Sequence, residues 1–247
     1  MTRPDFEENW RRRFTERGLM LDDDAGIAGW TPSGLETRMR NFQRLWPGAP
    51  AGSRWFDIGC GAGSYSRLLA EEGLRVIALD YSLPSVAKAR ARSPGIEAWC
   101  AADINRLPFP PASADGILCF GVLQALASPE QALLEMSTLL RPGGTLWVDA
   151  LNAHALPQIA RRVLHRRASL RYDTATQLCA RLRALGLKPE VHWIPIAPSR
   201  LYRLQPALEF APVRALLHRV PALGSMLSHS ILITARKPAT TNAPTSP

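Results

Sequence analysis

The chain has 247 residues, 46% of them apolar, which suits one α/β domain with appended segments. No apolar run approaches the roughly 20 residues that cross a bilayer, and the first residues lack the basic-then-apolar layout of a signal peptide, so we expect a cytoplasmic protein. The net charge of +9 is unevenly spread, because residues 1–150 carry 16 Lys and Arg against 18 Asp and Glu, whereas residues 151–247 carry 14 against 3.

Two helices are predicted before the first strand, over residues 5–17 and 33–45. We interpret residues 1–50 as an N-terminal helical cap. The acidic run Asp22–Asp24 between the two helices is expected to be a solvated loop.

From residue 54 onward, short apolar segments alternate with segments of helix length. The predicted strands cover residues 55–58, 75–79, 96–100, 116–120 and 145–148. The predicted helices between them cover residues 64–72, 83–92 and 129–140, and Pro142-Gly143-Gly144 is expected to stop the last one. Such alternation predicts a parallel sheet with crossover helices.

After the fifth strand, a basic stretch over residues 154–171 precedes a further helix. Asp173 is the expected N-cap of that helix, which ends near Gly186. Two more strands are predicted, over residues 191–197 and 230–235.

A basic amphipathic insertion, residues 198–227, separates these last two strands. We expect it to cap its own domain or to form a dimer contact, and an anionic membrane surface is the less favoured alternative. The main domain is predicted over residues 51–237, and the Pro/Thr/Ala-rich tail over 238–247 is expected to be disordered.

A glycine-rich segment, Asp57-Ile-Gly-Cys-Gly-Ala-Gly63, follows the first predicted strand. Glycine adopts backbone dihedrals closed to other residues and has no side chain, so such a turn lets the backbone approach a ligand closely. In dinucleotide enzymes a similar loop cradles a pyrophosphate at a helix N-terminus. The segment alone is a weak signal, because small-residue turns also serve purely structural connections.

Two acidic residues follow the next two predicted strands. Asp80 is placed to accept hydrogen bonds from both hydroxyls of a ribose, and Asp103 to accept one from an adenine amine. Taken singly, each is equally well explained as a helix cap or turn residue. Together with Asp57, they suit a ligand with an ammonium, a ribose, an adenine and a sulfonium cation, and they suit a pyrophosphate poorly.

Four ordered blocks resemble class I S-adenosylmethionine-dependent methyltransferases, in the small-molecule group that includes the ubiquinone and menaquinone biosynthesis enzymes. The blocks are Phe56–Gly63, Val76–Ser82, Ala102–Ile104 with Leu107–Phe109, and Leu139–Leu146. The resemblance covers about residues 54–150. It implies S-adenosylmethionine as the cofactor and an α/β, Rossmann-like sheet of seven strands, mostly parallel with the last strand antiparallel, and helices on both faces.

The resemblance also implies a role in cofactor binding for a set of residues on the strand ends: Asp57, Gly59, Gly61, Gly63, Asp80, Tyr81, Asp103, Ile104 and Phe120. The acids and glycines would hold the methionine, ribose and adenine parts in turn. Tyr81 would cover an adenine face, and Phe120 would lie near the methyl group. Without the resemblance, Phe120 is better explained as a core residue, and Tyr81 has a similar ambiguity.

A catalytic residue is not indicated by the sequence. Methyl transfer is an in-line displacement at an activated carbon, so the enzyme mainly aligns the reactants, excludes water and, where needed, supplies a base. Relatives often have a histidine after the fourth strand, where this chain has Gln124, which cannot be a general base. Asn152 and His154 are the remaining candidates, with Asp149 at the same strand end.

In this enzyme class N-terminal helices often cover the cofactor and substrate. Trp30, just before the second predicted helix, is therefore either part of a lid or a packing residue of the cap. Arg38 and Arg40 on that helix are expected to face solvent.

The sequence thus predicts a methyltransferase of EC class 2.1.1 that acts on oxygen, nitrogen or carbon of a small molecule, such as a lipid, quinone or sugar-type metabolite. One alternative is an RNA methyltransferase that uses the basic C-terminal region, although 27 of the 30 basic residues are Arg and we favour a coding bias as the cause. Another is a non-catalytic S-adenosylmethionine-binding or assembly protein. The four cysteines lie far apart, so no metal site is expected.

Overall fold

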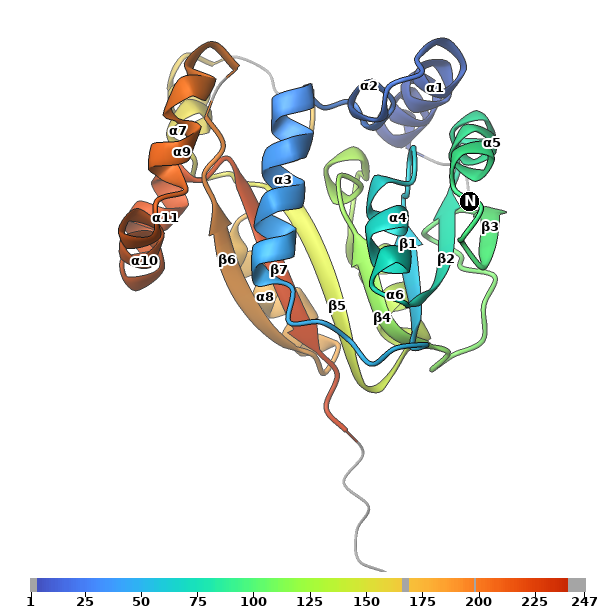
Figure 1. Cartoon of the computed structure of the whole chain (residues 1–247). Helices are drawn as coiled ribbons and strands as arrows, with labels where there is room; N and C mark the ends of the chain where they lie inside the picture. The colour runs from blue at the N-terminus through green and yellow to red at the C-terminus, as the bar shows by residue number, and fades with distance from the viewer. Residues whose placement is uncertain (1–3, 166–168, 198, 240–247) are drawn as a thin grey trace, which may run out of the picture.

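A single mixed sheet organises the computed structural model, which describes residues 4–165, 169–197 and 199–239 (Figure 1). The strand order is β3-β2-β1-β4-β5-β7-β6, and β7 lies antiparallel between β5 and β6 while β1 to β5 pair in parallel. The strands are β1 Arg54–Ile58, β2 Arg75–Asp80, β3 Ala98–Ala101, β4 Ala114–Cys119, β5 Leu140–Leu151, β6 Lys188–Ile194 and β7 Ser230–Arg236. The predicted seven-stranded methyltransferase-type sheet is confirmed.

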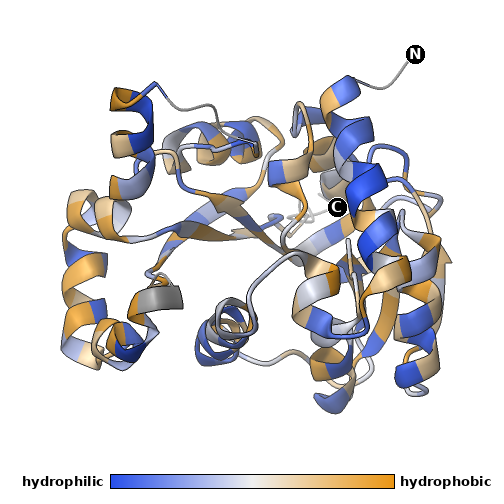
Figure 2. Ribbon diagram, turned by 90° about the horizontal axis from the view of Figure 1, so that it is seen from above, coloured by the Kyte–Doolittle hydropathy of each residue, from blue (hydrophilic) through white to orange (hydrophobic). Residues whose placement is uncertain are grey.

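Helices cover both faces of this sheet, which runs between two helical layers when seen from above (Figure 2). The α-helices are α1 Asp5–Met20, α2 Asp24–Ala28, α3 Pro32–Leu45, α4 Ser64–Glu71, α5 Leu83–Arg92, α6 Glu130–Leu139, α7 Leu156–Val163, α8 Ala175–Ala184, α9 Gln205–Leu208, α10 Ala211–Arg219 and α11 Pro221–Leu227. Two short 3₁₀ turns, η1 Leu123–Ala125 and η2 Ser199–Leu204, complete the described elements. Within the described ranges, every helix is too short or too polar to span a lipid bilayer.

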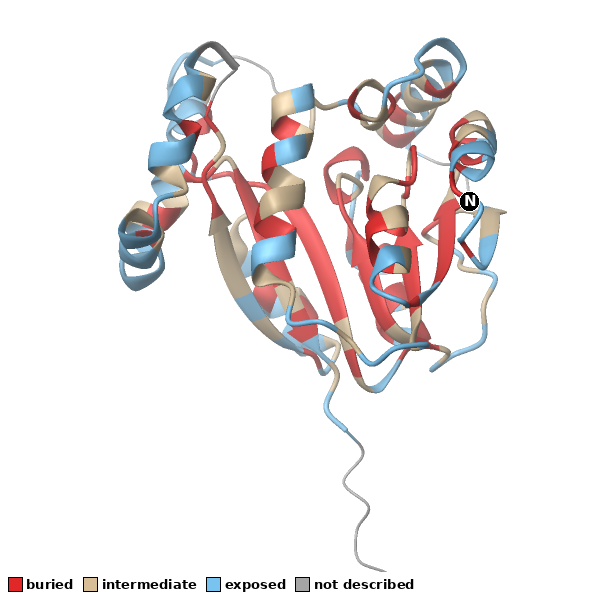
Figure 3. Ribbon diagram, viewed as in Figure 1, coloured by how far each residue is buried: buried red, intermediate tan, exposed pale blue. Residues whose placement is uncertain are grey.

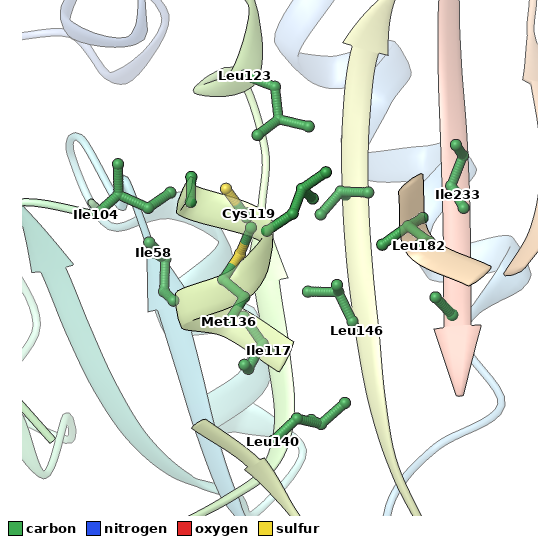
Figure 4. Packing of buried hydrophobic residues seen from close by; sticks show 14 of the residues in the cluster. Ile58, Ile104, Ile117, Cys119, Leu123, Met136, Leu140, Leu146, Leu182 and Ile233 are labelled. Atoms are coloured by element: carbon green, nitrogen blue, oxygen red, sulfur yellow. The ribbon is translucent and has the colours of Figure 1, made fainter. Parts of the chain in front are cut away.

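The two faces of the sheet bury separate apolar cores, so most residues of the central strands are buried (Figure 3). Successive side chains of a strand point to opposite faces, and in β4 Ile117 belongs to one core whereas Leu118 belongs to the other. The first core includes Met136 of α6 and Leu182 of α8 (Figure 4). The second includes Phe42 of α3, together with side chains of α4. Burial on both sides explains why these strands are continuously apolar in sequence.

Two predicted helix boundaries are wrong. The N-cap of α8 is Thr174, whose Oγ1 accepts a hydrogen bond from the Gln177 N–H at 3.1 Å, whereas Asp173 forms ion pairs with Arg171 and Arg181. The segment 142–144 does not end a helix but lies inside β5, because α6 has already stopped at residue 139.

The acidic run before the second predicted helix is a solvated loop only at Asp22, whose side chain is 83% exposed. Asp23 caps α2, since its Oδ1 accepts from the Gly26 N–H at 2.7 Å. Asp24 forms an ion pair with Arg67 of α4 and accepts a hydrogen bond from Ser64 Oγ at 2.6 Å. These contacts fasten the cap to the helix that follows the glycine loop.

The predicted insertion folds as η2, α9, α10 and α11, beside β6 (Figure 1). Its Glu209 pairs with Arg40 and Arg44 of α3, and Gly224 of α11 packs on Trp193 of β6. The segment therefore packs against its own domain. The predicted tail, residues 238–247, lies outside the described residues from position 240 onward.

Candidate functional site

A pocket lies at the edge of the sheet where β1, β2 and β4 end, beneath the N-terminal helices. Eight of the residues that the sequence assigns to cofactor binding line this pocket: Asp57, Gly59, Gly61, Asp80, Tyr81, Asp103, Ile104 and Phe120. Gly63 does not line it but forms the N-cap of α4. Because parallel strands bring their carboxyl ends to one edge, acids distant in sequence meet here.

The glycine loop needs glycine for two separate reasons. Gly59, Gly61 and Gly63 all have positive φ, at 78°, 51° and 79°, which side-chain-bearing residues rarely adopt. A Cβ at Gly59 would lie 2.1 Å from Val122 Cγ2, and one at Gly63 would lie 2.8 Å from a ring carbon of Trp99. At Gly61 there is space for a Cβ. Glycine is required at this position because of the backbone conformation and because a side chain would reduce access to the pocket.

Asp57 lies beneath the loop at the end of β1 and is only 3% exposed. Its Oδ2 accepts a hydrogen bond from Ser66 Oγ at 2.6 Å. Burial raises the pKa of this carboxyl to about 6, and the Ser66 hydrogen bond opposes that shift. A cationic ligand group nearby favours the ionised form, so this site is suited to an ammonium.

Asp80 is held by the backbone on both of its oxygens. The Gly61 N–H donates to Oδ2 at 3.0 Å, and the Ser82 N–H donates to Oδ1 at 2.8 Å. Burial raises the pKa of this carboxyl, and the backbone hydrogen bonds oppose the rise. Each carboxylate oxygen accepts more than one hydrogen bond, so the fixed carboxylate retains acceptor capacity for a ligand diol.

Arg11 of α1 contacts the two side chains that the sequence assigns to adenine. Its Nη1 lies 3.0 Å from Asp103 Oδ2, and its guanidinium carbon lies 4.8 Å from the centroid of the Tyr81 ring. The other oxygen of Asp103 accepts from the Asn105 N–H at 3.0 Å. Ile104, which is buried, lines the pocket beside them.

The roof of the pocket is aromatic and apolar. Trp10 and Phe14 come from α1, Ile27 comes from α2, and Trp30 comes from the turn before α3. A Cβ at Gly121 would lie 2.7 Å from the Trp30 ring, so the ring rests on the backbone just after β4. The N-terminal helices thus cover the pocket, and Trp30 belongs to this cover.

The expectation that Arg38 faces solvent is wrong. Its side chain is 11% exposed, and its guanidinium carbon lies 4.8 Å from the Trp30 ring centroid. Nη2 donates to Ser230 Oγ at 2.9 Å, and Nε lies 3.7 Å from Asp149 Oδ2. A partner carboxylate offsets the cost of burying the cation. Arg40, by contrast, is one third exposed and pairs with acidic side chains.

A second, smaller cavity lies between α3 and the strands β5 and β7. Arg38 and Asp149 line it, and Tyr65 and Phe120 line both this cavity and the first pocket. The rings of Tyr65 and Phe120 meet edge to face at 4.9 Å between centroids. The two cavities therefore share an aromatic wall at the end of β4.

Asp149 is oriented within this cavity by the backbone after β4. The Gly121 N–H donates to its Oδ1 at 2.6 Å, whereas Oδ2 faces Arg38 Nε at the longer distance of 3.7 Å. Burial raises the pKa of Asp149 although the Arg38 charge opposes the rise. The carboxylate thus has one anchored oxygen and one that can take a proton.

The two catalytic candidates from the sequence lie away from both cavities. Asn152 is fully buried, and its Nδ2 donates to the carbonyl oxygens of Ser225 and Ser228 at 2.6 and 2.8 Å. Its Oδ1 accepts from the His154 N–H at 2.9 Å. His154 itself is exposed. Asn152 therefore fastens the end of the insertion to β5.

The sequence of residues 56–148 matches the family model described as methyltransferase domain. The demethylmenaquinone methyltransferase of Renibacterium salmoninarum is 38% identical over 141 residues, which are 56% of this chain and 59% of that protein. Residues 56–148 form a class I methyltransferase domain. The malonyl-[acyl-carrier protein] O-methyltransferase of Enterobacter lignolyticus is 34% identical to the chain over 126 residues, 50% of each protein.

Solved structures share the fold of the methyltransferase domain. The S-adenosylmethionine-dependent methyltransferase from Mesorhizobium loti has a TM-score of 0.61 at 19% identity, over 81% of this chain and 98% of that chain. The [4+2]-cyclase SpnF has a TM-score of 0.63 at 21% identity, over 97% of this chain and 98% of that chain. Identities this low show the fold alone, and a cyclase among them illustrates that the fold does not fix the reaction.

The chain spans between 33% and 59% of the length of the first curated relatives it matches. The predicted cofactor, S-adenosylmethionine, is confirmed for the methyltransferase domain. The pocket fits such a cofactor, because it combines a glycine loop open to a ligand backbone with carboxylates that favour cationic and hydroxyl groups.

Proposed function

We propose that this chain is an S-adenosylmethionine-dependent methyltransferase that acts on a small-molecule acceptor. The observation that carries the proposal is that the glycine loop and the carboxylates of Asp57, Asp80 and Asp103 line one pocket. Three acids around one pocket favour a cationic adenosyl ligand and disfavour a pyrophosphate. Relatives named for demethylmenaquinone and ubiquinone biosynthesis support a small-molecule acceptor.

In this proposal each group of pocket residues binds a different part of the cofactor. Asp57 and the glycine loop hold the methionine end, Asp80 holds the ribose diol, and the Asp103 carboxylate with the Ile104 amide holds the adenine edge. Phe120 excludes water beside the reacting carbon. When bound, S-adenosylmethionine supplies a methyl carbon that its sulfonium has already activated for displacement.

Asp149 serves as the general base on the acceptor side. Phe120 lines both cavities, so an acceptor hydroxyl that reaches this wall approaches the unanchored oxygen of Asp149. That oxygen would take the proton that the acceptor hydroxyl loses when it is methylated. Arg38 neutralises the carboxylate before transfer and keeps it oriented. This assignment replaces Asn152 and His154 as candidates.

Calorimetry and isotope transfer test the proposal together. We expect S-adenosylmethionine and S-adenosylhomocysteine to bind at sub-millimolar concentration, and labelled methyl groups to enter the small-molecule fraction of a deproteinised cell extract. Failure of both cofactor forms to bind would overturn the proposal. Label found only in ribonuclease-sensitive material identifies an RNA methyltransferase instead, and binding without transfer to any fraction identifies a non-catalytic protein.

Arg11→Ala is expected to tighten S-adenosylmethionine binding about two- to fivefold. The guanidinium lies on the Tyr81 ring and on Asp103, where the proposal puts adenine, so the adenine must displace it. The partly exposed ion pair is worth about 0.5–1 kcal/mol, which sets the size of the effect. Titration calorimetry measures it. The control is Arg12→Ala. Arg12 lies on the same helix, and its exposed side chain donates a hydrogen bond to Asn9 Oδ1. Weaker binding by Arg11→Ala contradicts the expectation.

A further inference from the structure

Exposed large apolar side chains are concentrated in two segments that follow β5. Of the sixteen such residues in the described part of the chain, eleven lie on or beside α7 or in residues 199–227. We call these two segments together the basic apolar face. An exposed apolar patch of this kind marks an interaction site in a folded protein.

The orientation of α7 is the opposite of that expected for a helix that covers its own domain. Leu156, Ile159 and Val163 follow a spacing of three and four residues, so they share one side of the helix. All three are exposed, and Val163 is 72% exposed. The buried residue of α7 is the polar Gln158, at 6% exposure. The helix thus directs its polar side inward and its apolar side outward.

The insertion continues this pattern. Gln205, Leu217 and Gly224 are buried and attach the segment to the domain. Phe210, at 62% exposure, and Leu216 are left in contact with solvent. The insertion therefore covers β6 with few side chains and leaves most of its apolar surface unpartnered in the described structure.

The charge of the face has a single sign. Residues 156–165 and 199–227 contain six arginines and one acidic residue, Glu209. Glu209 is already paired with Arg40 and Arg44 of α3. In the part of the chain that the structure describes, Arg161 and Arg162 of α7 have no ion pair. The face is therefore positively charged as well as apolar.

Figure 1 places α7 and the helices α9, α10 and α11 along the side of the molecule that ends in β6. We propose that this face docks on an anionic lipid surface. Exposed apolar side chains with flanking arginines are the features by which an interfacial helix enters the headgroup region of such a surface. The inference does not depend on the proposed methyl transfer.

Two other occupants fit the charge and the apolarity less well. A second copy in a symmetric dimer would place two copies of this positively charged face against each other, and like charges at an interface repel. A nucleic acid would satisfy the arginines through its phosphates but would leave the exposed aliphatic side chains without a partner.

Co-sedimentation of the full chain with vesicles tests the proposal. We expect binding to phosphatidylcholine vesicles that contain about 30% phosphatidylglycerol, little binding to pure phosphatidylcholine, and release at about 1 M salt. Ile159→Asp with Val163→Asp should lower partitioning at least about tenfold. Arg161→Gln with Arg162→Gln should lower it about tenfold or more, since each arginine near the surface adds to the attraction.

Leu134→Asp is the matched control, because Leu134 is an exposed leucine on α6, away from the face. It should bind vesicles like the wild type, and all variants should keep the wild-type melting temperature. Equal binding to anionic and neutral vesicles, no binding to either, or unchanged binding by the α7 variants overturns the proposal. The face is assigned to a second copy instead if three results coincide. The wild type is a dimer in light scattering, the α7 variants dissociate that dimer, and no vesicle binding is seen.

Discussion

Asp80→Asn is expected to weaken S-adenosylmethionine and S-adenosylhomocysteine binding by about 10- to 100-fold. The asparagine keeps the shape of the side chain but removes the charge and one acceptor oxygen. Two backbone N–H groups, from Gly61 and Ser82, already hold the carboxylate, so the amide must turn an N–H toward one of them. Hydrogen bonds to a charged group contribute about 1.5–3 kcal/mol, which gives the expected range. Titration calorimetry with each ligand measures it.

Asp115→Asn is the control for this experiment. Asp115 also belongs to a strand and accepts a backbone hydrogen bond, from the Arg54 N–H at 2.6 Å, but it does not line the pocket. It pairs with Arg141 instead. Its asparagine variant should bind the cofactor like the wild type. Unchanged binding by a folded Asp80→Asn protein would remove Asp80 from the site.

Asp149→Asn is expected to lower the rate of methyl transfer by about 100- to 10,000-fold, the range typical of a general base, while cofactor affinity stays within about twofold. Burial raises the pKa of Asp149. The wild-type rate should therefore rise with pH as the carboxylate ionises, and the variant should lose this rise. The rate is measured at saturating cofactor, with the acceptor that the labelling experiment identifies.

Other titratable groups near Asp149 do not account for such a rise. Tyr65 and Cys119 have pKa values raised by burial, so they stay neutral in acidic and neutral solution. Burial lowers the pKa of His229 to about 4, with the Arg38 charge acting in the same direction. The pKa of Asp57 is about 6 in the free protein, but saturation with the cationic cofactor keeps this group ionised.

Asp173→Asn is the matched control for Asp149→Asn. Asp173 is a buried carboxylate that pairs with Arg171 and Arg181, and it lines neither cavity. Its loss should lower stability but leave the shape of the pH profile unchanged. A wild-type rate and pH profile for Asp149→Asn would mean that the ion pair with Arg38 only supports the fold.

The sheet and the floor of the pocket follow from local sequence signals. Buried parallel strands are continuously apolar, and the acids stand directly at their ends, so the positions of Asp57, Asp80 and Asp103 could be read in order along the chain. Because β1, β2 and β3 are neighbouring parallel strands, the three acids meet at one edge of the sheet. Errors arose at element ends, where Asp173 and Thr174 are both good capping residues and the sequence does not separate them.

The acceptor side was not predictable in the same way. Arg38 lies on a polar helical stretch that resembles a solvated surface, and its hydrogen-bond partner Ser230 is 192 residues away. On the adenine side, Arg11 and Asp103 are likewise 92 residues apart. No periodicity or motif links such pairs, because tertiary packing alone brings them together. The sequence signal on this side was the absence of the histidine that relatives often have after the fourth strand, which left any general base unassigned.

The clamp between Asp24 of α2 and Arg67 and Ser64 of α4 has a kinetic consequence. It ties the roof of the pocket to the helix that begins at the glycine loop, so we expect the two to move together on this side. We therefore expect ligand exchange to proceed by rotation of individual side chains such as Arg11, and not by an opening motion of the whole helical cap. Side-chain rotation takes nanoseconds or less, whereas collective hinge motions take microseconds to milliseconds. Cofactor association should therefore be limited by diffusion rather than by a slow opening step.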